Sequence, residues 1–415
     1  MNFNVLDLFS GAGGMAEGFI QAGFRVPFAS DHSKEAAATY KNRHAQLGYN
    51  LNYYEGDVKD LTKRKFLCDF LNNSKIDVVV GGPPCQGFSL VGRRAEDDFR
   101  NVLFLDFLKV VKLVQPSYFV MENVEGILTY EFKKIKGISG REYENISAPE
   151  VIVKEAKYFG YAVKYQLLNA KDYGVPQNRP RVIFLGYRAC FRGAKVLNLV
   201  TIPEFPEKRN SIVTIEEAIS DIRFLKSGQT SEKYDNRFKL SEYQKSLRNG
   251  LTPDVNGDFI PAATLYNHKA SVHREKTTDR FKLLKPGEDI DSLLNRLDQE
   301  QYKIYVTKKY RCRKLAPNSV SPTVLTLPDD IVHYDLNNPR ILTVRELARI
   351  QSFDDSFEFL GKRTTGGNRR KFEVPQYTQV GNAVPPLFAC AIAGKIMVAL
   401  KCMLNESEIL NINKS

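Results

Sequence analysis

The sequence predicts an α/β fold with a doubly wound, mostly parallel sheet, joined to a second, smaller and irregular domain. Two observations lead to this fold class. Over the first 190 residues, short apolar runs alternate with helix-like stretches, as they do where helices cover both faces of a parallel sheet. After Cys190 the alternation stops, and short segments with scattered prolines and many cations take its place.

Apolar runs that end in turn residues mark the expected strands. These strands lie at 4–9, 26–29, 76–80, 118–121, 163–168 and 181–187. Stretches with apolar residues at helical spacing predict helices at 16–23, 33–45 and 101–114. Near the C-terminus, 343–353 predicts a short helix, and 386–404 predicts a longer one that is apolar on one face.

The predicted first domain comprises residues 1–190 and is completed by the segment 375–415, whose helix we expect to dock on it. Residues 191–374 form the predicted second domain; in its stretch 191–340 no long helical period occurs except at 289–297. The loop at 361–371, GKRTTGGNRRK, carries five cations and no acid. A solvated surface loop and a phosphate contact explain this charge equally well.

Composition and charge narrow the class of protein. The formal net charge of +12 favours a polyanionic partner, first of all a nucleic acid. No run of eighteen or more apolar residues is present, so we expect no membrane span. The N-terminus lacks the build of a signal peptide, which points to the cytoplasm. The six cysteines form no C-x-x-C pair and the histidines do not cluster near them, so we expect neither a metal site nor disulfides.

A glycine-rich turn follows the first strand in the stretch DLFSGAGGM. Gly11, Gly13 and Gly14 let backbone amides approach a ligand at the start of the next helix. Asp31, about twenty residues further on, suits a ribose hydroxyl pair, and Asp57 follows a third possible strand. A tight turn with two helix-capping aspartates would explain the same residues. The pattern favours a nucleotide-like ligand and leaves open whether it is a dinucleotide or S-adenosylmethionine.

A lone cysteine, Cys85, lies in the stiff loop GGPPCQGFS directly after the strand at 76–80. Two prolines fix the backbone there, at the edge where ligands meet an open α/β sheet. A thiol in this place is either a nucleophile or a packed side chain. Glu122 ends the next strand, and Arg179 and Arg181 stand two apart at a strand start, which predicts side chains on one face. Their convergence on one sheet edge favours the nucleophile.

Five segments, DLFSGAGG, GGPPCQGFS, ENV, QNRPR and QVGNAVPP, occur in this order along the chain. Together they resemble the motif set of the DNA (cytosine-5)-methyltransferases, and RELARIQSF resembles the family segment before the last motif. The resemblance covers residues 1 to about 190 and about 340 to 396. It implies a Rossmann-like, S-adenosylmethionine-dependent methyltransferase fold with a target-recognition domain between the two matched parts.

The resemblance also implies a mechanism. Cys85 would add to C6 of a cytosine flipped out of double-stranded DNA, and Glu122 would hold the N3 edge of that base. C5 would then take the methyl group of S-adenosylmethionine, which becomes S-adenosylhomocysteine. Arg179 and Arg181 would lie near the base O2 and the cysteine loop. The DNA backbone would be contacted by Gln86 and Ser89.

The family pattern places the cofactor between the glycine turn, the two acids and the C-terminal motif. The cofactor residues that it implies are Phe9, Ser10, Gly11, Gly13, Gly14, Asp31, His32, Asp57, Val58, Pro83, Asn382 and Ala383. It implies a bacterial modification enzyme that acts as a monomer on double-stranded DNA, without a metal or a membrane. A cognate restriction endonuclease would be a genetic rather than a physical partner.

Two other functions share parts of this pattern. A tRNA methyltransferase of the same fold is disfavoured by the QGFS sequence that ends the cysteine loop, and by the size of the recognition region, roughly 150 residues. A catalytically silent DNA-binding module is disfavoured because Cys85, Glu122, Arg179 and Arg181 are all present.

Overall fold

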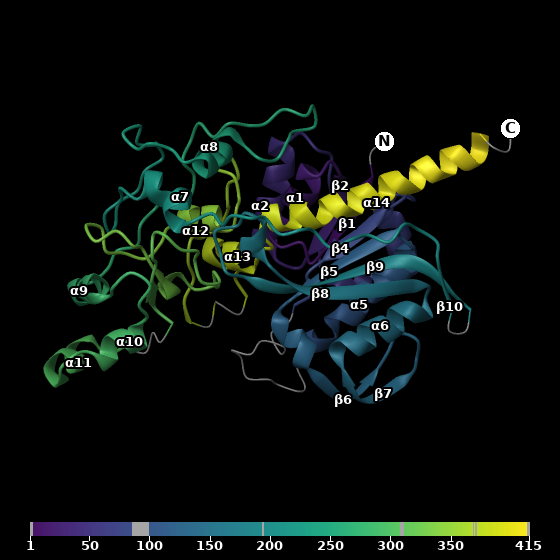
Figure 1. The fold of residues 1–415 in the computed structure, drawn as a ribbon, viewed down its shortest axis with the longest axis horizontal. Coiled ribbons are helices and arrows are strands. Elements are labelled where there is room, and N and C mark those ends of the chain that lie inside the picture. Colours follow the sequence, from purple (N-terminus) through teal and green to yellow (C-terminus); the bar gives the residue numbers. More distant parts are fainter. Residues whose placement is uncertain are drawn as a thin grey trace.

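The computed structural model describes residues 3–84, 99–192, 195–307, 311–367, 369 and 372–412. Cys85, Gln86 and Ser89 lie outside these residues. Figure 1 shows a sheet with helices packed on both sides, next to a less regular region built mainly from loops and short helices. This arrangement agrees with the fold class that the alternation of strands and helices predicts.

Five parallel strands form one side of an eight-stranded sheet, in the order β5-β4-β1-β2-β3, with β3 at the edge. They are β1 Asn4–Leu8, β2 Arg25–Asp31, β3 Asn52–Glu55, β4 Val78–Gly81 and β5 Tyr118–Asn123. Their carboxyl ends lie level, because Leu8 pairs with Ser30 on β2 and with Gly81 on β4, and Gly81 pairs with Met121 on β5. The residues that follow these strands are therefore collected at one edge of the sheet.

Three antiparallel strands complete the sheet. β9 (Pro180–Arg192) pairs with β5, and β8 (Tyr161–Asn169) and β10 (Lys195–Asn198) both pair with β9. The sheet therefore continues to Asn198, beyond the predicted domain boundary at residue 190.

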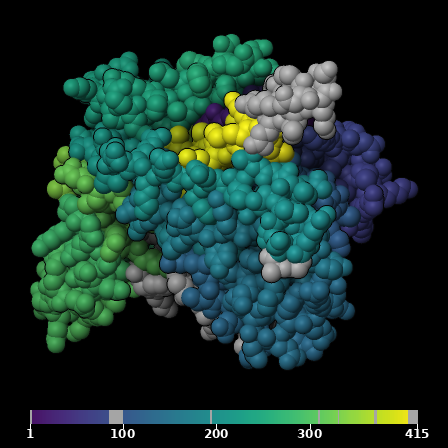
Figure 2. Space-filling view, turned by 45° about the vertical axis from the view of Figure 1, so that its right-hand side comes forward, coloured from purple at the N-terminus to yellow at the C-terminus, as the bar shows by residue number. Residues whose placement is uncertain are grey.

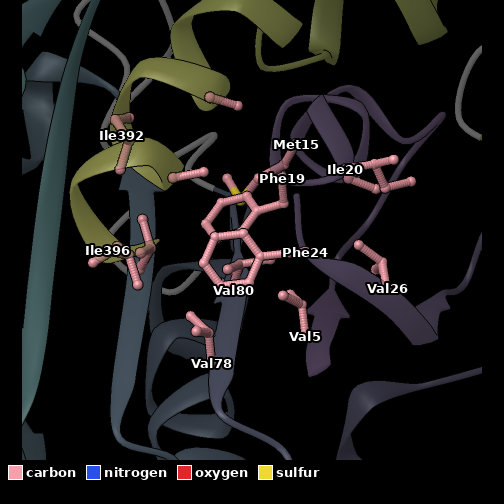
Figure 3. Close-up of a cluster of buried hydrophobic side chains, with 14 of the residues drawn as sticks. Val5, Met15, Phe19, Ile20, Phe24, Val26, Val78, Val80, Ile392 and Ile396 are labelled. Carbon is pink, nitrogen blue, oxygen red and sulfur yellow. The ribbon is translucent and has the colours of Figure 1, made fainter. Parts of the chain in front are cut away.

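One face of the sheet is covered by α1 (Gly14–Gln21), α2 (Lys34–Gln46) and α14 (Pro386–Ile412). Figure 3 shows this core, in which Val5, Val78 and Val80 point toward Phe19 of α1 and Ile392 of α14. The residues next to these valines in the strands face the other way and belong to a second core. The period of two that predicts a strand thus also divides its side chains between the two cores.

The opposite face is covered by α5 (Leu103–Val114) and α6 (Ala148–Tyr158), with α3 (Val58–Leu61) and α4 (Arg64–Leu71) at its side. A hairpin of β6 (Glu131–Lys136) and β7 (Glu142–Ser147) precedes α6. The sequence prediction contained neither the hairpin nor α6. The start of α6 is a capping box between Ser147 and Glu150, a local signal that marks a helix.

The irregular region contains more helix than the sequence predicts. Its helices are α7 Ile215–Ile219, α8 Glu242–Asn249, α9 Glu275–Leu283, α10 Ile290–Asn295 and α11 Gln299–Tyr305. α10 falls inside the predicted 289–297, and the other helices are short ones that the sequence did not indicate. α8 and α9 each bury one apolar residue, Leu247 and Phe281, so neither produces an apolar period along the sequence.

Two short strands and two further helices lie between this region and α14. The strands are β11 Arg313–Lys314 and β12 Ile331–Val332, and the helices are α12 Val344–Ile350 and α13 Gln376–Asn382. Single turns of 3-10 helix occur at Phe99–Val102, Glu125–Thr129, Ala170–Tyr173, Ser220–Ile222 and Pro328–Asp330. α12 confirms the short helix predicted from Thr343, which caps it through a capping box with Glu346.

Buried ion pairs hold α12 in place. Every residue of α12 is buried, including Arg349, whose guanidinium lies 2.5 Å from Asp221 and 2.6 Å from Asp355. Arg340 pairs with Glu346 at 2.7 Å without exposure of either side chain. Because a buried charge is costly unless it is paired, these contacts fix α12 against the irregular region on one side and its own following loop on the other.

The last helix docks on α1, as predicted from its apolar face. Gly18 of α1 makes close contact possible, since a Cβ there would lie 2.5 Å from Pro386 O and from the Ala389 Cβ. Figure 2 shows part of this helix at the surface, in yellow, between the irregular region and the sheet. Gln376–Leu404 is long and apolar enough to cross a membrane by length and composition alone, but core helices meet the same criterion and its inner face packs in the first core.

Candidate active site

Two charged residues meet at the carboxyl edge of the sheet. Glu122 near the end of β5 and Arg181 near the start of β9 form an ion pair, with Arg181 Nε 2.7 Å from Glu122 Oε1. Their side chains are 12% and 11% exposed, so one side of the pair stays open. A Cβ on Gly82 would lie 3.1 Å from Glu122 Oε2. The carboxylate therefore lies directly against the chain that leaves β4 toward Cys85.

The residue after Glu122 holds that same chain. Asn123 is buried, and its amide donates a hydrogen bond of 3.4 Å to the carbonyl of Pro83, which is also buried. The Asn123 side-chain oxygen accepts from the backbone N–H of Val124 at 2.9 Å. The ENV segment thus contributes both a largely buried acid and an anchor for the proline loop. The contacts of Cys85 itself lie outside the described residues.

Arg179 lies in a different environment from Arg181, although their spacing predicts side chains on one face. Its guanidinium is buried and donates to the carbonyl of Val324 at 3.1 Å, and to those of Gly381 and Ala383 at 2.9 and 3.0 Å. The strand β9 begins at Pro180, so Arg179 precedes the regular alternation on which the prediction depends. Arg179 therefore joins three separate segments, whereas Arg181 faces Glu122.

The glycine turn is held by Asp31. The two oxygens of this carboxylate accept from the backbone N–H of Gly11 at 2.9 Å and of Ser33 at 2.8 Å. Gly11 and Gly13 have φ values of 53° and 101°, a region that glycine enters without strain. The acid that the sequence assigns to a ligand thus lies beside the turn and also shapes it. Asp31 is not a helix cap, because Ser33 caps α2.

The remaining residues around the turn differ in exposure. Phe9, at φ 54°, packs against the second core, and the Ser10 hydroxyl lies 3.1 Å from the hydroxyl of Tyr53. The side chain of His32 is 75% exposed, with Nδ1 3.4 Å from Asp31 Oδ1. An exposed ring beside an acid at the end of β2 is free to cover a ligand that binds there.

Asp57 and Val58 lie at the end of β3. Asp57 caps α3, because its carboxylate accepts from the N–H of Lys59 at 3.0 Å. The helix cap that the sequence left open as an alternative is therefore confirmed for Asp57. Capping uses one of the two carboxylate oxygens. Val58, the first residue of α3, is buried.

A buried acid beneath the glycine turn was not predicted. Asp7 of β1 is buried, and the hydroxyl of Tyr40 donates to one of its oxygens at 3.3 Å. Burial raises the pKa of Asp7 to about 8. The ring of Tyr40 lies against Gly13, where a Cβ would come within 2.9 Å of it. An acid inside an otherwise apolar strand was the sequence signal that could have identified Asp7.

The C-terminal motif reaches this site from α13. A Cβ on Gly14 would lie 2.2 Å from the carbonyl of Val384 and 3.3 Å from the Cβ of Ala383. Gly14 and Ala383 therefore contact each other. Asn382 is exposed and lines a cavity of about 160 Å³ together with Tyr377 and Thr378. Among the residues that the structure describes, no group of three His, Cys, Asp or Glu side chains could hold a metal ion.

The chain matches known proteins over nearly its whole length. The family model of the C-5 cytosine-specific DNA methylases matches residues 3–398. The type II methyltransferase M.DdeI of Desulfomicrobium norvegicum is 35% identical over 95% of this chain and 88% of its own. The type II methyltransferase M1.HphI of Haemophilus parahaemolyticus is 33% identical over 98% and 89%.

Solved structures show the same fold. A putative DNA modification methyltransferase encoded within a prophage of E. coli superposes with a TM-score of 0.69 at 24% identity, covering 96% of this chain and all of that one. The Dnmt2 methyltransferase of S. pombe gives 0.52 at 18% identity, covering 97% and 99%. The methyltransferase fold predicted from the motif order is thus confirmed. By the family match and these identities, the chain belongs to the C-5 cytosine-specific DNA methylases and is a DNA (cytosine-5)-methyltransferase.

Proposed function

We propose that the protein transfers the methyl group of S-adenosylmethionine to C5 of a cytosine flipped out of double-stranded DNA, through a covalent adduct between Cys85 and C6. One observation carries this proposal. The Glu122–Arg181 pair lies against Gly82, three residues before Cys85, at the level carboxyl edge of the sheet. A base held by Glu122 would therefore lie within reach of a thiol at the end of the proline loop.

The side chains of this site divide the chemistry among themselves. The Cys85 thiolate forms the bond to C6, and the electron pair moves toward N3, where Glu122 supports protonation. C5 becomes nucleophilic and accepts the methyl group that the bound cofactor supplies. Loss of the C5 proton to a base, which we expect to act through water, then drives elimination of Cys85. Arg181 orients the Glu122 carboxylate and, as a nearby cation, favours the thiolate.

Arg179 acts as a positioning residue in this proposal. Its bonds to the carbonyls of Val324, Gly381 and Ala383 tie the start of β9 to the C-terminal motif. The direct contact with the base O2 that the family pattern implies for Arg179 stays a prediction. Contacts of Gln86 and Ser89 with the DNA backbone also stay predictions.

S-adenosylmethionine fits the residues around the glycine turn. A Cβ on Gly11 would meet nothing within 4 Å, so its backbone is open to a ligand, and Asp31 places an acid beside it for the ribose hydroxyls. Phe9 and His32 flank this place. The further cofactor contacts that we propose are with Ser10, Gly14, Asp57, Val58, Pro83, Asn382 and Ala383. Gly14 and Ala383 also contact each other, so both residues help to pack the C-terminal motif against the start of α1.

The relatives support a role in a restriction–modification system, because M.DdeI and M1.HphI are named as type II methyltransferases. We propose that residues 191–374 read the target site, and that residues 1–190 with 375–415 carry out catalysis. The net charge of +12 suits a DNA substrate. We also propose that the protein works as a monomer in the cytoplasm, without a physical partner.

Transfer of labelled methyl groups tests this function. Purified protein is mixed with tritiated S-adenosylmethionine and either plasmid DNA or tRNA, and we expect label on the DNA alone. Cys85→Ser should abolish the transfer, since a serine hydroxyl is a far weaker nucleophile. Label on tRNA alone, or full activity of Cys85→Ser, contradicts the proposal. Bisulfite sequencing of DNA from an expressing host then identifies the target site.

A further inference from the structure

An exposed aromatic ring stands on the basic loop between α12 and α13. Phe372 is 82% exposed, which is the highest value for an aromatic side chain in the part of the chain that the structure describes. A single exposed apolar residue is common on protein surfaces and by itself indicates nothing. Phe372 differs from such residues in two ways. Hydrogen bonds fix its backbone in a turn, and its loop lies where the two predicted domains meet.

The loop presents the ring on an anchored turn. The backbone N–H groups of Phe372 and Glu373 both donate to the carbonyl of Arg369, at 3.0 and 2.9 Å. The Glu373 carboxylate in turn binds Lys362 at 2.7 Å and the hydroxyl of Thr365. The outgoing and returning parts of the loop are thereby joined at its base. These hydrogen bonds fix the backbone of Phe372, and its ring remains exposed to solvent.

The loop lies at the junction of the two predicted domains. Arg363 donates to Ser271 Oγ at 2.8 Å and to the carbonyl of Lys269 at 3.3 Å, which ties the loop to the irregular region. The cavity of about 160 Å³ is lined by Leu327, from the chain before α12, and by Glu373 and Asn382, from the chain after the loop. In Figure 1 the segment that leads into α13 lies between α9 to α11 and the sheet.

The charge of the loop suits a polyanion. Its sequence holds five cations between residues 361 and 371. Glu373 neutralises Lys362 at the base, and Arg363 binds neutral oxygens. Arg369 is exposed beside the ring. A cation next to a flat apolar surface is the combination that binds a phosphate and stacks on a base in nucleic-acid complexes.

We propose that Phe372 is a DNA-contacting residue, whose ring packs against a base or sugar of the substrate duplex while Arg369 of the same loop neutralises a phosphate. This inference rests on the proposed function, since it requires a DNA duplex at the junction of the two domains. It places a DNA contact in the loop between α12 and α13, at the C-terminal end of the residues 191–374 that we propose read the target site. A second copy of this chain is the other occupant that an exposed ring could serve, and the test separates the two.

The absence of tryptophan from the sequence allows a direct test. Phe372→Trp creates a protein whose tryptophan emission reports on this one position, and stacking on a base quenches it. Tyr158→Trp is the matched control. Tyr158 is 51% exposed at the end of α6, which covers the sheet outside the region that we propose reads the target site. The ligand is a duplex that contains the site found by bisulfite sequencing, and a labelled copy reports binding by anisotropy.

We expect the duplex to quench Phe372→Trp and to leave Tyr158→Trp unchanged. Phe372→Ala should bind the duplex roughly five- to a hundredfold more weakly, the effect of losing one aromatic contact with a base. Binding of the duplex without a change in the emission of Phe372→Trp overturns this inference and leaves the proposed function intact. Emission that changes with protein concentration in the absence of DNA overturns it in favour of self-association. A wild-type protein that neither binds nor methylates DNA refutes both proposals.

Discussion

Arg181 Nε lies 2.7 Å from Glu122 Oε1 at the edge of the sheet where the chain leaves for Cys85. The pair joins β5 to β9, two strands that are neighbours in the sheet but lie far apart in the sequence. One carboxylate oxygen is held by Arg181, and the other lies beside Gly82 on the way to Cys85. This geometry leads to the first prediction.

Glu122→Gln is expected to slow methyl transfer by about a hundredfold to ten-thousandfold, the range for loss of one positioned acid or base. An amide can still bind the base edge but cannot support protonation at N3. The measurement is kcat with tritiated S-adenosylmethionine and plasmid DNA. Lys134→Gln is the control, because it breaks the exposed pair with Glu142, 2.9 Å long, and should leave kcat unchanged. Full activity of Glu122→Gln would remove Glu122 from the mechanism.

Arg179→Ala tests the positioning role of its guanidinium. The change leaves the buried carbonyls of Val324, Gly381 and Ala383 without these donors, at about 1–3 kcal/mol for each group that finds no other partner. We expect a lower free energy of unfolding, measured by urea denaturation, and a higher KM for S-adenosylmethionine. An unchanged unfolding curve with a lost kcat would instead support direct contact with the base.

Asp31→Ala should weaken cofactor binding about tenfold or more, because the glycine turn loses its anchor at Gly11, the start of α2 loses the anchor at Ser33, and the acid for the ribose is gone. Calorimetric titration with S-adenosylhomocysteine measures the affinity without turnover. His32→Ala removes a side chain that is 75% exposed and has no role in shaping the turn. It should therefore have a smaller effect, and equal affinities for wild type and Asp31→Ala would disprove the assignment.

Gly18→Ala is expected to push α14 away from α1. A Cβ at Gly18 would lie 2.5 Å from Pro386 O and from the backbone N of Cys390, which no rotamer change can relieve. Overpacking of this kind costs about 1–3 kcal/mol. Gly394→Ala, on α14, is the matched control. Its Cβ would meet nothing within 4 Å, and alanine favours a helix over glycine by about 1 kcal/mol. Thermal unfolding should move in opposite directions for the two variants.

Asp7 predicts a pH dependence of stability. Burial raises its pKa from 3.8 to about 8 in the folded protein, so between these values the folded state holds a proton that the unfolded state has released. The free energy of unfolding contributed by Asp7 therefore falls as pH rises, by up to about 1.4 kcal/mol per pH unit, and becomes constant above pH 8. Asp7→Asn keeps the neutral shape and should flatten the curve between pH 5 and 8. Parallel urea-denaturation curves for both proteins would contradict this.

Much of the fold could be predicted because the signals are local. A strand buried on both faces produces a continuous apolar run such as the three valines at 78–80, and a glycine or proline directly after it marks the carboxyl edge. The helices α8 and α9 could not be predicted in this way. Each buries one apolar residue and depends on contacts with distant segments, which leave no period in the sequence.

The sequence by itself determined the family, the order of the strands along the chain, and the acids and glycines of the site, because these depend on residue type and spacing. The tertiary structure alone decided which of these residues meet. Arg179 and Arg181 are two residues apart, yet one binds three buried carbonyls and the other binds Glu122. Asp7 and Tyr40 meet beneath Gly13 because β1 and α2 pack together, a contact that no local pattern contains. Side-chain partners follow from packing between distant elements, and spacing along the chain does not determine them.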